Sequence, residues 1–225
     1  MNRLPLIALI AFFCLVAAGC GGGEGGGEAS EPEPEPETQP ATVAGCRSVD
    51  APEPEERTAP RPTKRLDPAK RYDLTFRTNC GTFAIRLDVQ GAPATAASLV
   101  SLARRGYFDE TIFHRIVLGF VIQGGDPSAS GSGRPGYKTV DRPRPDARYT
   151  HGVVAMAKTQ TEPPGTSGSQ FFVVTGTDVG LPPEYAVVGR VVKGLAVVDR
   201  IGALGDANEQ PTQTVEIEKA TVSVS

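Results

Sequence analysis

The stretch FHRIVLGFVIQGGDP, residues 113–127, joins apolar runs suited to a core with an arginine and a glutamine that are not. Its end, two glycines followed by an aspartate and a proline, indicates a turn. Gly119 interrupts the run, and the break lets Arg115 and Gln123 share a surface with some of the apolar residues. The stretch therefore predicts strands that contribute to a core and also to a partly polar outer surface.

Alternation of apolar and polar residues around this stretch predicts a mainly β fold. Residues 72–77 and 83–88 alternate on either side of Asn-Cys-Gly, which indicates a hairpin. One helix is expected to open at Pro93 and stop at Gly106, and a second is expected over residues 195–204. The remaining β-rich runs are short, and they are separated by glycine-rich turns without βα alternation. This pattern favours one domain built as a closed antiparallel barrel or a sandwich.

The N-terminal residues have the layout of a secretory signal: one positive charge, an apolar run of 15 residues and a small-residue end. As a helix the run reaches about 22 Å, less than a hydrocarbon core of about 30 Å. The residues before Cys20 resemble the lipobox of bacterial lipoproteins, although Ala17 stands where leucine is commoner. Residues 1–19 are therefore expected to be a signal peptide, and lipidated Cys20 is expected to anchor the chain to the bacterial cell membrane outside the cytoplasm. The alternative is an ordinary cleaved signal with an incidental cysteine.

Residues 20–45 are rich in Gly, Glu and Pro, and they predict a disordered tether because almost nothing in them can be buried. Residues 20–60 carry ten acidic and two basic side chains, whereas residues 61–225 carry sixteen acidic and twenty basic ones. The second segment therefore has a net charge of about +4 (20 − 16). Its basic residues are scattered along the sequence and are not interleaved with aromatic residues, so nucleic-acid binding is not expected.

Two of the four cysteines, Cys46 and Cys80, lie beyond the signal and the lipidation site. In an exported protein a lone pair of cysteines is expected to form a disulfide, and no histidine lies near either one in the sequence. The bond would pin a Pro-rich extension, residues 46–70, to the folded domain, residues 71–225. Two free thiols are the alternative.

Several motifs do not support the chemistry with which they are associated. Residues 131–136, GSGRPG, have the spacing of a dinucleotide-binding loop but lack the preceding strand and the following helix. Residues 165–169, GTSGS, have the wrong spacing for a nucleophile elbow. His114 and His151 are the only histidines, and we expect the first to be structural and the second to lie in a loop. Asp126 is expected to cap its turn, and no metal or cofactor is expected.

Five runs occur in the order, and nearly at the separations, found in the cyclophilin family of peptidyl-prolyl cis-trans isomerases: FHRIVLGFVIQGGDP, GSGRPGY, GVVAMAK, GSQFFV and VVGRVVKG. The resemblance covers about residues 72–225. It implies a closed eight-stranded antiparallel β-barrel capped by two α-helices, with a substrate groove on the outer face of the barrel. The expected partners are proline-containing peptides and unfolded exported proteins, and the chain is expected to be a monomer.

By this resemblance the catalytic arginine of the family falls on Arg115. Its groove residues fall on Phe120, Val121, Gln123, Ala157, Lys158, Gln170, Phe172, Leu181 and Tyr185. A guanidinium suits the reaction because it can donate a hydrogen bond to the prolyl nitrogen as the amide twists, without losing its own proton. Adjacent residues of a strand point to opposite faces, so one of Phe171 and Phe172 should lie in the core and the other in the groove.

The sequence departs from many eukaryotic members of the family at three groove positions. Gly180 stands in place of a tryptophan, Tyr185 in place of a histidine and Lys158 in place of an asparagine. We expect catalysis to survive these changes and cyclosporin binding to weaken. The leading expectation is an isomerase that assists the folding of exported proteins. A non-catalytic proline-peptide binding module or holdase at the cell surface is the alternative, and a spacer for a surface assembly is a third possibility.

Overall fold

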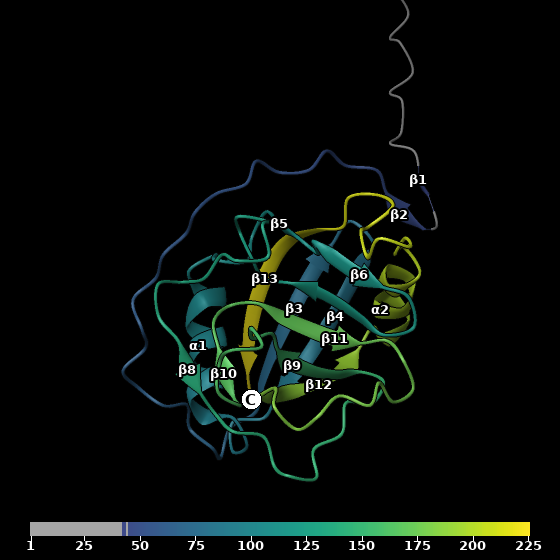
Figure 1. The fold of residues 1–225 in the computed structure, drawn as a ribbon. Helices are drawn as coiled ribbons and strands as arrows, with labels where there is room; N and C mark the ends of the chain where they lie inside the picture. Colours follow the sequence, from purple (N-terminus) through teal and green to yellow (C-terminus); the bar gives the residue numbers. More distant parts are fainter. Residues whose placement is uncertain (1–41, 44) are drawn as a thin grey trace, which may run out of the picture. The chain divides into compact units, whose positions relative to one another are not determined.

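The computed structural model of the chain describes residues 42–43 and 45–225, and the expectations for the signal peptide, Cys20 and nearly all of the tether lie outside these residues. Figure 1 shows the arrangement of the described elements. In chain order they are β1 (Thr42–Val43), β2 (Cys46–Arg47), β3 (Tyr72–Thr78), β4 (Gly81–Leu87), α1 (Pro93–Arg104), β5 (Thr111–Ile112), β6 (Arg115–Val117), β7 (Val121–Gly124), β8 (Thr139–Val140), β9 (Val153–Met156), β10 (Thr166–Ser167), β11 (Phe171–Val174), β12 (Val187–Lys193), α2 (Leu195–Gly202) and β13 (Glu216–Val224).

Nine of these strands form one antiparallel sheet in the order β5-β13-β3-β4-β12-β9-β11-β7-β6. The expected hairpin is present as β3 and β4, which pair from Asp73 opposite Arg86 to Thr78 opposite Gly81. Both expected helices are present, and α1 begins with Pro93 in its first turn. Neither helix in residues 42–43 and 45–225 combines the length and the apolar character needed to cross a membrane.

The expectation of a closed eight-stranded barrel is wrong, because the sheet curls but does not close. Its terminal strands, β5 and β6, have only two and three residues and do not pair with each other. Where the curled sheet brings its ends together, a single bridge joins Ile112 to Asp126 in place of a ladder. β5 is paired with β13 and β6 with β7, and the two segments follow each other in the chain with only Phe113 and His114 between them, so they add no ladder that would close the sheet. The fold is therefore a curled half-barrel with two helices.

Each face of the curled sheet covers its own set of apolar residues. The inner face and the two helices enclose the main core, which includes Phe76, Phe83, Phe171, Leu102 and Ile201, all nearly inaccessible to solvent. The outer face carries a second cluster: Val121, Tyr149, Val153, Ala155, Phe172 and Val174, with Phe120, Leu181 and Tyr185 packed against it. Strands β9 and β11 are consequently buried along their whole length. As expected, the neighbouring residues Phe171 and Phe172 belong to different faces.

A Pro-rich segment, residues 46–71, runs along the margin of the domain before β3 and is called the strap below (Figure 1). A disulfide joins Cys46 to Cys80 in the hairpin turn. Farther along, the amides of Glu55 and Ala59 donate hydrogen bonds to the carbonyls of Pro127 and Pro135, each over 3.0 Å. The strap is thus hydrogen-bonded to both ends of the loop that runs from Pro127 to Pro135.

Candidate functional site

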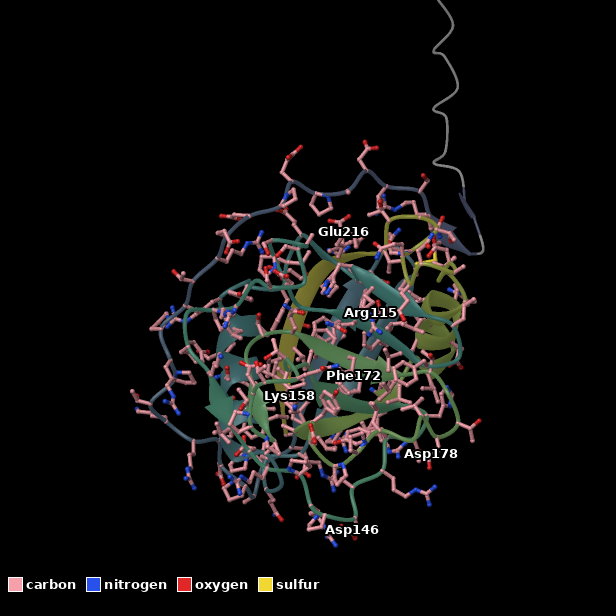
Figure 2. All side chains as sticks on the ribbon, in the orientation of Figure 1. Arg115, Asp146, Lys158, Phe172, Asp178 and Glu216 are labelled. Carbon is pink, nitrogen blue, oxygen red and sulfur yellow. A yellow bond between two sulfur atoms is a disulfide. The ribbon has the colours of Figure 1, made fainter. Side chains whose placement is uncertain are left out.

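One row of residues crosses five neighbouring strands on the outer face. Arg115 lies opposite Gln123, Gln123 opposite Phe172, Phe172 opposite Ala155, and Ala155 opposite Val187. Directly opposite residues project from the same face of a sheet, so these five side chains form a continuous line. In Figure 2, Phe172 is labelled between Arg115 and Lys158 on this part of the sheet. The row places a guanidinium and a carboxamide at one end of an apolar strip.

Three aromatic rings build the apolar end of this surface. Phe172 is 4% exposed, and its ring meets that of Tyr185 edge-on with centroids 5.6 Å apart. The buried ring of Tyr149 contacts both, at 6.3 Å from Phe172 and 6.0 Å from Tyr185. The Tyr149 hydroxyl donates to the carbonyl of Tyr185 over 2.8 Å and accepts from its amide over 3.0 Å. Burial accordingly raises the pKa of Tyr149, and the rings form a fixed apolar seat.

The Arg115 guanidinium is held by two partners. Its Nε donates to Glu209 Oε2 over 2.7 Å, and its Nη1 donates to Gln123 Oε1 over 3.3 Å. Glu209 lies in the loop between α2 and β13, has a left-handed backbone (φ 64°) and accepts a bond from the Ile116 amide through its carbonyl. The Asp206 carboxylate orders that loop by accepting the amides of Asn208 and Gln210. Glu209 therefore orients the guanidinium from outside the β-sheet.

Polar side chains continue from the arginine into the domain. Gln123 Nε2 donates to Gln170 Oε1 over 3.1 Å, and Gln170 Nε2 donates to the Gly133 carbonyl over 3.2 Å and to Asp126 Oδ2 over 3.4 Å. Asp126 is fully buried and also accepts hydrogen bonds from the Ser128 amide and hydroxyl and from the Gly133 amide. As expected, Asp126 caps its turn, and it also connects the loop 126–133 to the row of site residues.

Lys158 lies beside the seat but is turned away from solvent. Its side chain is 2% exposed, its Nζ is 2.9 Å from Glu184 Oε2, and it lies 5.4 Å from the centroid of the Tyr185 ring. The charge is therefore balanced by a carboxylate and an aromatic face. A pocket of about 160 Å³ adjoins it, lined by Gln123, Ala157, Lys158 and Gln170 together with the loop 131–134.

The structure thus brings all ten predicted site residues together. Phe120, Val121, Ala157, Leu181 and Tyr185 belong to the second apolar cluster or pack against it, and the other five are Arg115, Gln123, Lys158, Gln170 and Phe172. Gly119 turns the chain between β6 and β7 with φ 63°, as the break in the sequence predicts. Tyr149 and Glu209 were not predicted. They lie in loops without a periodic pattern, and only the folded chain brings them to the site. No group of His, Cys, Asp or Glu in the described part of the chain could hold a metal ion.

His114 is half-buried next to the site, and both of its ring nitrogens are inaccessible to solvent. Neither ring nitrogen has a hydrogen-bond partner among the described residues. Burial lowers the pKa of His114 below its ordinary value of 6.5; the Asp126 charge opposes this effect and the Arg115 charge adds to it. The folded chain therefore favours the neutral form of the His114 ring, in line with the expected structural role. His151, expected in a loop, lies near Asp199 Oδ1, 2.6 Å from its Nε2.

Stability should fall as the pH drops below the ordinary histidine pKa of 6.5, because His114 binds a proton more readily in the unfolded chain. The contribution of His114 is complete above that value and declines toward its lower folded-state pKa. Urea unfolding at pH 5, 6 and 7 measures this slope. The variant His114→Phe, which cannot be protonated, should have a flatter profile between pH 5 and 7; an unchanged slope would show that His114 does not cause it.

Comparison with known proteins is consistent with this geometry. Residues 73–222 match the family model described as cyclophilin type peptidyl-prolyl cis-trans isomerase. The chain is 39% identical over 155 residues to peptidyl-prolyl cis-trans isomerase-like 1 of Neurospora crassa, covering 67% of this chain and 93% of that protein. It is 38% identical over 153 residues to the protein of the same name from Mus musculus, covering 66% and 90%.

A solved structure supports the same assignment. The crystal structure of a cyclophilin type isomerase from Cryptosporidium parvum superposes with a TM-score of 0.63 at 28% identity, covering 68% of this chain and 98% of that one. A second structure of that protein, determined in the presence of the dipeptide Ala-Pro, gives a TM-score of 0.62. These organisms are eukaryotes, so the relatives do not support the bacterial lipoprotein form that the N-terminal sequence predicts. On its sequence match and its fold, the chain belongs to the cyclophilin-type peptidyl-prolyl cis-trans isomerases, a family of enzymes.

Proposed function

We propose that this chain twists X-Pro peptide bonds in the groove on its outer face, with Arg115 as the catalytic residue. The observation that carries the proposal is the row from Arg115 through Gln123 to Phe172, which sets a charged donor beside an apolar seat. Nε and Nη1 of Arg115 are engaged by Glu209 and Gln123, while Nη2 has no partner among the described residues. That nitrogen is free to donate to a substrate.

The chemistry requires stabilisation of a twisted amide. Rotation about the C–N bond of a peptide has a barrier of about 18–20 kcal/mol, because that bond has partial double-bond character. At the twisted state the prolyl nitrogen regains a lone pair, and a charged donor can stabilise it by about 1.5–3 kcal/mol. A millionfold acceleration needs about 8 kcal/mol, so Arg115 supplies only a part. The remainder comes from a groove that fits the twisted peptide better than either planar form.

Some groove residues contact the proline ring, and others hold the peptide on either side of it. Phe120, Phe172 and Leu181 seat the proline ring, with Val121 beneath them and Tyr185 at the rim. Gln123 and the backbone of Ala157 and Lys158 hold the flanking peptide, while Gln170 fixes Gln123. Because Lys158 is already balanced by Glu184, its charge does not need to be neutralised by the substrate.

Exchange spectroscopy on an Ala-Pro peptide tests the proposal. Cross-peaks between the cis and trans signals should grow faster in the presence of the protein, because uncatalysed interconversion takes tens to hundreds of seconds. Shifted peptide signals without faster exchange would instead identify a proline-peptide binding module or holdase that uses the same groove. An unchanged spectrum at high protein concentration would contradict both.

Glu209→Ala should lower kcat/KM by about two- to fivefold, the value of a partly exposed ion pair. The guanidinium loses the partner that fixes Nε, while Gln123 still binds Nη1. Glu209→Gln retains an acceptor oxygen and should recover much of the activity, which a purely structural role would not explain. Asp146→Ala removes a carboxylate from another exposed arginine pair and serves as the control. Equal kcat/KM in all variants would contradict the orienting role.

We further propose that the enzyme is an exported lipoprotein that assists the folding of exported proteins as a membrane-anchored monomer. The support is the N-terminal sequence: a signal-like run, small residues before Cys20 and a Gly/Glu/Pro-rich tether. The mass of the mature, unreduced protein tests lipidation and the Cys46–Cys80 bond together. Cys20→Ser should release the protein into the soluble fraction of a bacterial host, and continued membrane retention of that variant would contradict the anchor.

A further inference from the structure

A cleft of about 720 Å³ lies between the end of the strap, helix α1 and the end of β13. Five of its lining residues are basic, and none is acidic: Lys64, Arg65, Lys70, Arg104 and Arg105. Three of them come from the strap and two from the C-terminal end of α1, so the fold gathers charges that the sequence separates by about forty positions. The cleft shares no lining residue with the row of site residues or its adjoining pocket.

These five charges differ from most others in the described part of the chain because no ion pair joins any of them to a carboxylate. Ten other basic residues have such pairs: Arg47, Arg57, Arg77, Arg86, Arg115, Lys138, Arg144, Arg148, Lys158 and Lys219. The nearby Asp67 is not part of the lining, and its Oδ1 accepts the Ala69 amide. Like charges held together repel one another, and a bound polyanion would remove that repulsion.

The backbone that carries the charges is fixed at several points. Leu66 packs against the main core, and the Asp67 amide donates to the Tyr72 hydroxyl. Arg71 and Ser225 exchange two backbone hydrogen bonds, of 2.9 and 3.1 Å, which hold Lys70 beside Val224. Arg104 and Arg105 lie at the end of a regular helix. The cleft is therefore preformed, and its strap side precedes the part of the chain that matches the family model.

The positive field also extends beyond the cleft. Burial raises the pKa of Tyr137, and the guanidinium groups of Arg105 and Arg61 oppose that rise. Arg61 lies in the strap just before the lining residues and, like them, has no ion pair among the described residues. Arg61 and Arg105 therefore both lie close enough to Tyr137 to act on its hydroxyl, which places a sixth unpaired cation near the cleft.

We propose that this cleft binds a ligand that carries several phosphate groups. Guanidinium groups donate paired hydrogen bonds that match phosphate oxygens, and the lining supplies three arginines together with the hydroxyls of Thr63 and Ser101. A polyphosphate concentrates several charges within a short length and so matches five cations that line one cleft, whereas an acidic peptide carries one charge per side chain. The only aromatic lining residue, Tyr72, is 6% exposed, so no open ring is available to stack nucleic-acid bases.

The test uses the full chain with Cys20→Ser, so that no lipid anchor contributes, and inorganic tripolyphosphate as the probe in calorimetry. Arg104→Ala/Arg105→Ala and Lys64→Ala/Arg65→Ala should each weaken binding by about tenfold or more, because each pair removes charge-assisted hydrogen bonds. Arg142→Ala/Arg144→Ala removes the same charge from another exposed loop and should bind like the parent. Isomerisation of an Ala-Pro peptide should be equal in all of these variants, since no site residue changes.

A second arm identifies the source of the phosphate. Vesicles of phosphatidylcholine with and without phosphatidylglycerol are sedimented with the same variants. Cleft-dependent binding to the phosphatidylglycerol vesicles alone identifies several neighbouring lipid headgroups, each with one phosphate, as the source, and binding to tripolyphosphate alone identifies a soluble ligand. Binding to neither, equal weakening in the Arg142/Arg144 control, or tighter binding to a polyglutamate peptide than to tripolyphosphate at equal charge would overturn the proposal.

Discussion

Arg115→Ala is expected to lower kcat/KM for an Ala-Pro peptide by about 10- to 150-fold, the range set by the loss of one charged hydrogen bond. The change removes the only charged donor of the row that crosses β6, β7 and β11. The Arg115 side chain is 33% exposed and its partner Glu209 is 49% exposed, so its removal leaves no buried charge behind. The thermal midpoint should therefore remain nearly unchanged. Exchange spectroscopy and thermal unfolding of the same preparation measure both quantities.

Two further variants show whether the guanidinium itself matters. Arg115→Lys retains a positive charge but loses the forked geometry that lets the side chain hold Glu209 and Gln123 together, so it should recover only part of the rate. Arg144→Ala, an equally simple loss of an exposed arginine, should have the parental rate. A large fall in the thermal midpoint of Arg115→Ala would show that Arg115 is structural, and full activity would remove it from the mechanism.

Phe172→Ala is expected to have the largest effect on stability among the site variants, about 3–5 kcal/mol, because it empties a buried aromatic position. Phe172 contacts Tyr149 and Tyr185, so its loss also opens the apolar seat. Since a domain is stable by about 5–15 kcal/mol, the variant should still fold at low temperature. There its kcat/KM should be well below that of the parent. Urea unfolding and exchange spectroscopy at 10 °C are the measurements.

The neighbouring residue provides a matched control. Phe171→Ala removes the same side chain from the next position of β11, but Phe171 faces the main core and is 1% exposed. It should lose similar stability while retaining most of its kcat/KM under conditions in which it is folded. If both variants lose activity equally, the effect of Phe172 is a general consequence of loosening β11. If neither does, Phe172 does not seat the substrate.

Local patterns were sufficient to predict the elements of the fold. The alternation over residues 72–88 predicts β3 and β4, and Pro93 and Gly106 delimit α1 closely. Closure of the sheet was not predictable in this way. It depends on how the two ends of a curled sheet meet, and here β5 and β6 meet only as consecutive segments of the chain that do not pair with each other. The pairing of the folded sheet, which leaves a single bridge between Ile112 and Asp126 at its ends, decided this point.

For the candidate site, too, some features could be predicted from the sequence and others only from the folded structure. Arg115, Gln123 and Phe172 were identified from runs that resemble a known family, and their identities set what chemistry is available. Their alignment in one row depends on strand order and register, which no single run contains. Glu209 lies 94 positions from Arg115 in sequence and reaches it only through the loop after α2. Loop residues of this kind have no periodicity by which they could be found.

The sequence by itself determined the element types, because these follow from side-chain chemistry and short-range spacing, and its resemblance to a known family indicated Arg115 and the groove residues as candidates. The tertiary structure alone decided which charges meet. It pairs Arg115 with Glu209 and Lys158 with Glu184, and it gathers the strap cations and the end of α1 into one cleft. The physical reason is that electrostatic interactions depend on distance in space, and distance in space is fixed only when the sheet has curled and the strap has been bonded to it.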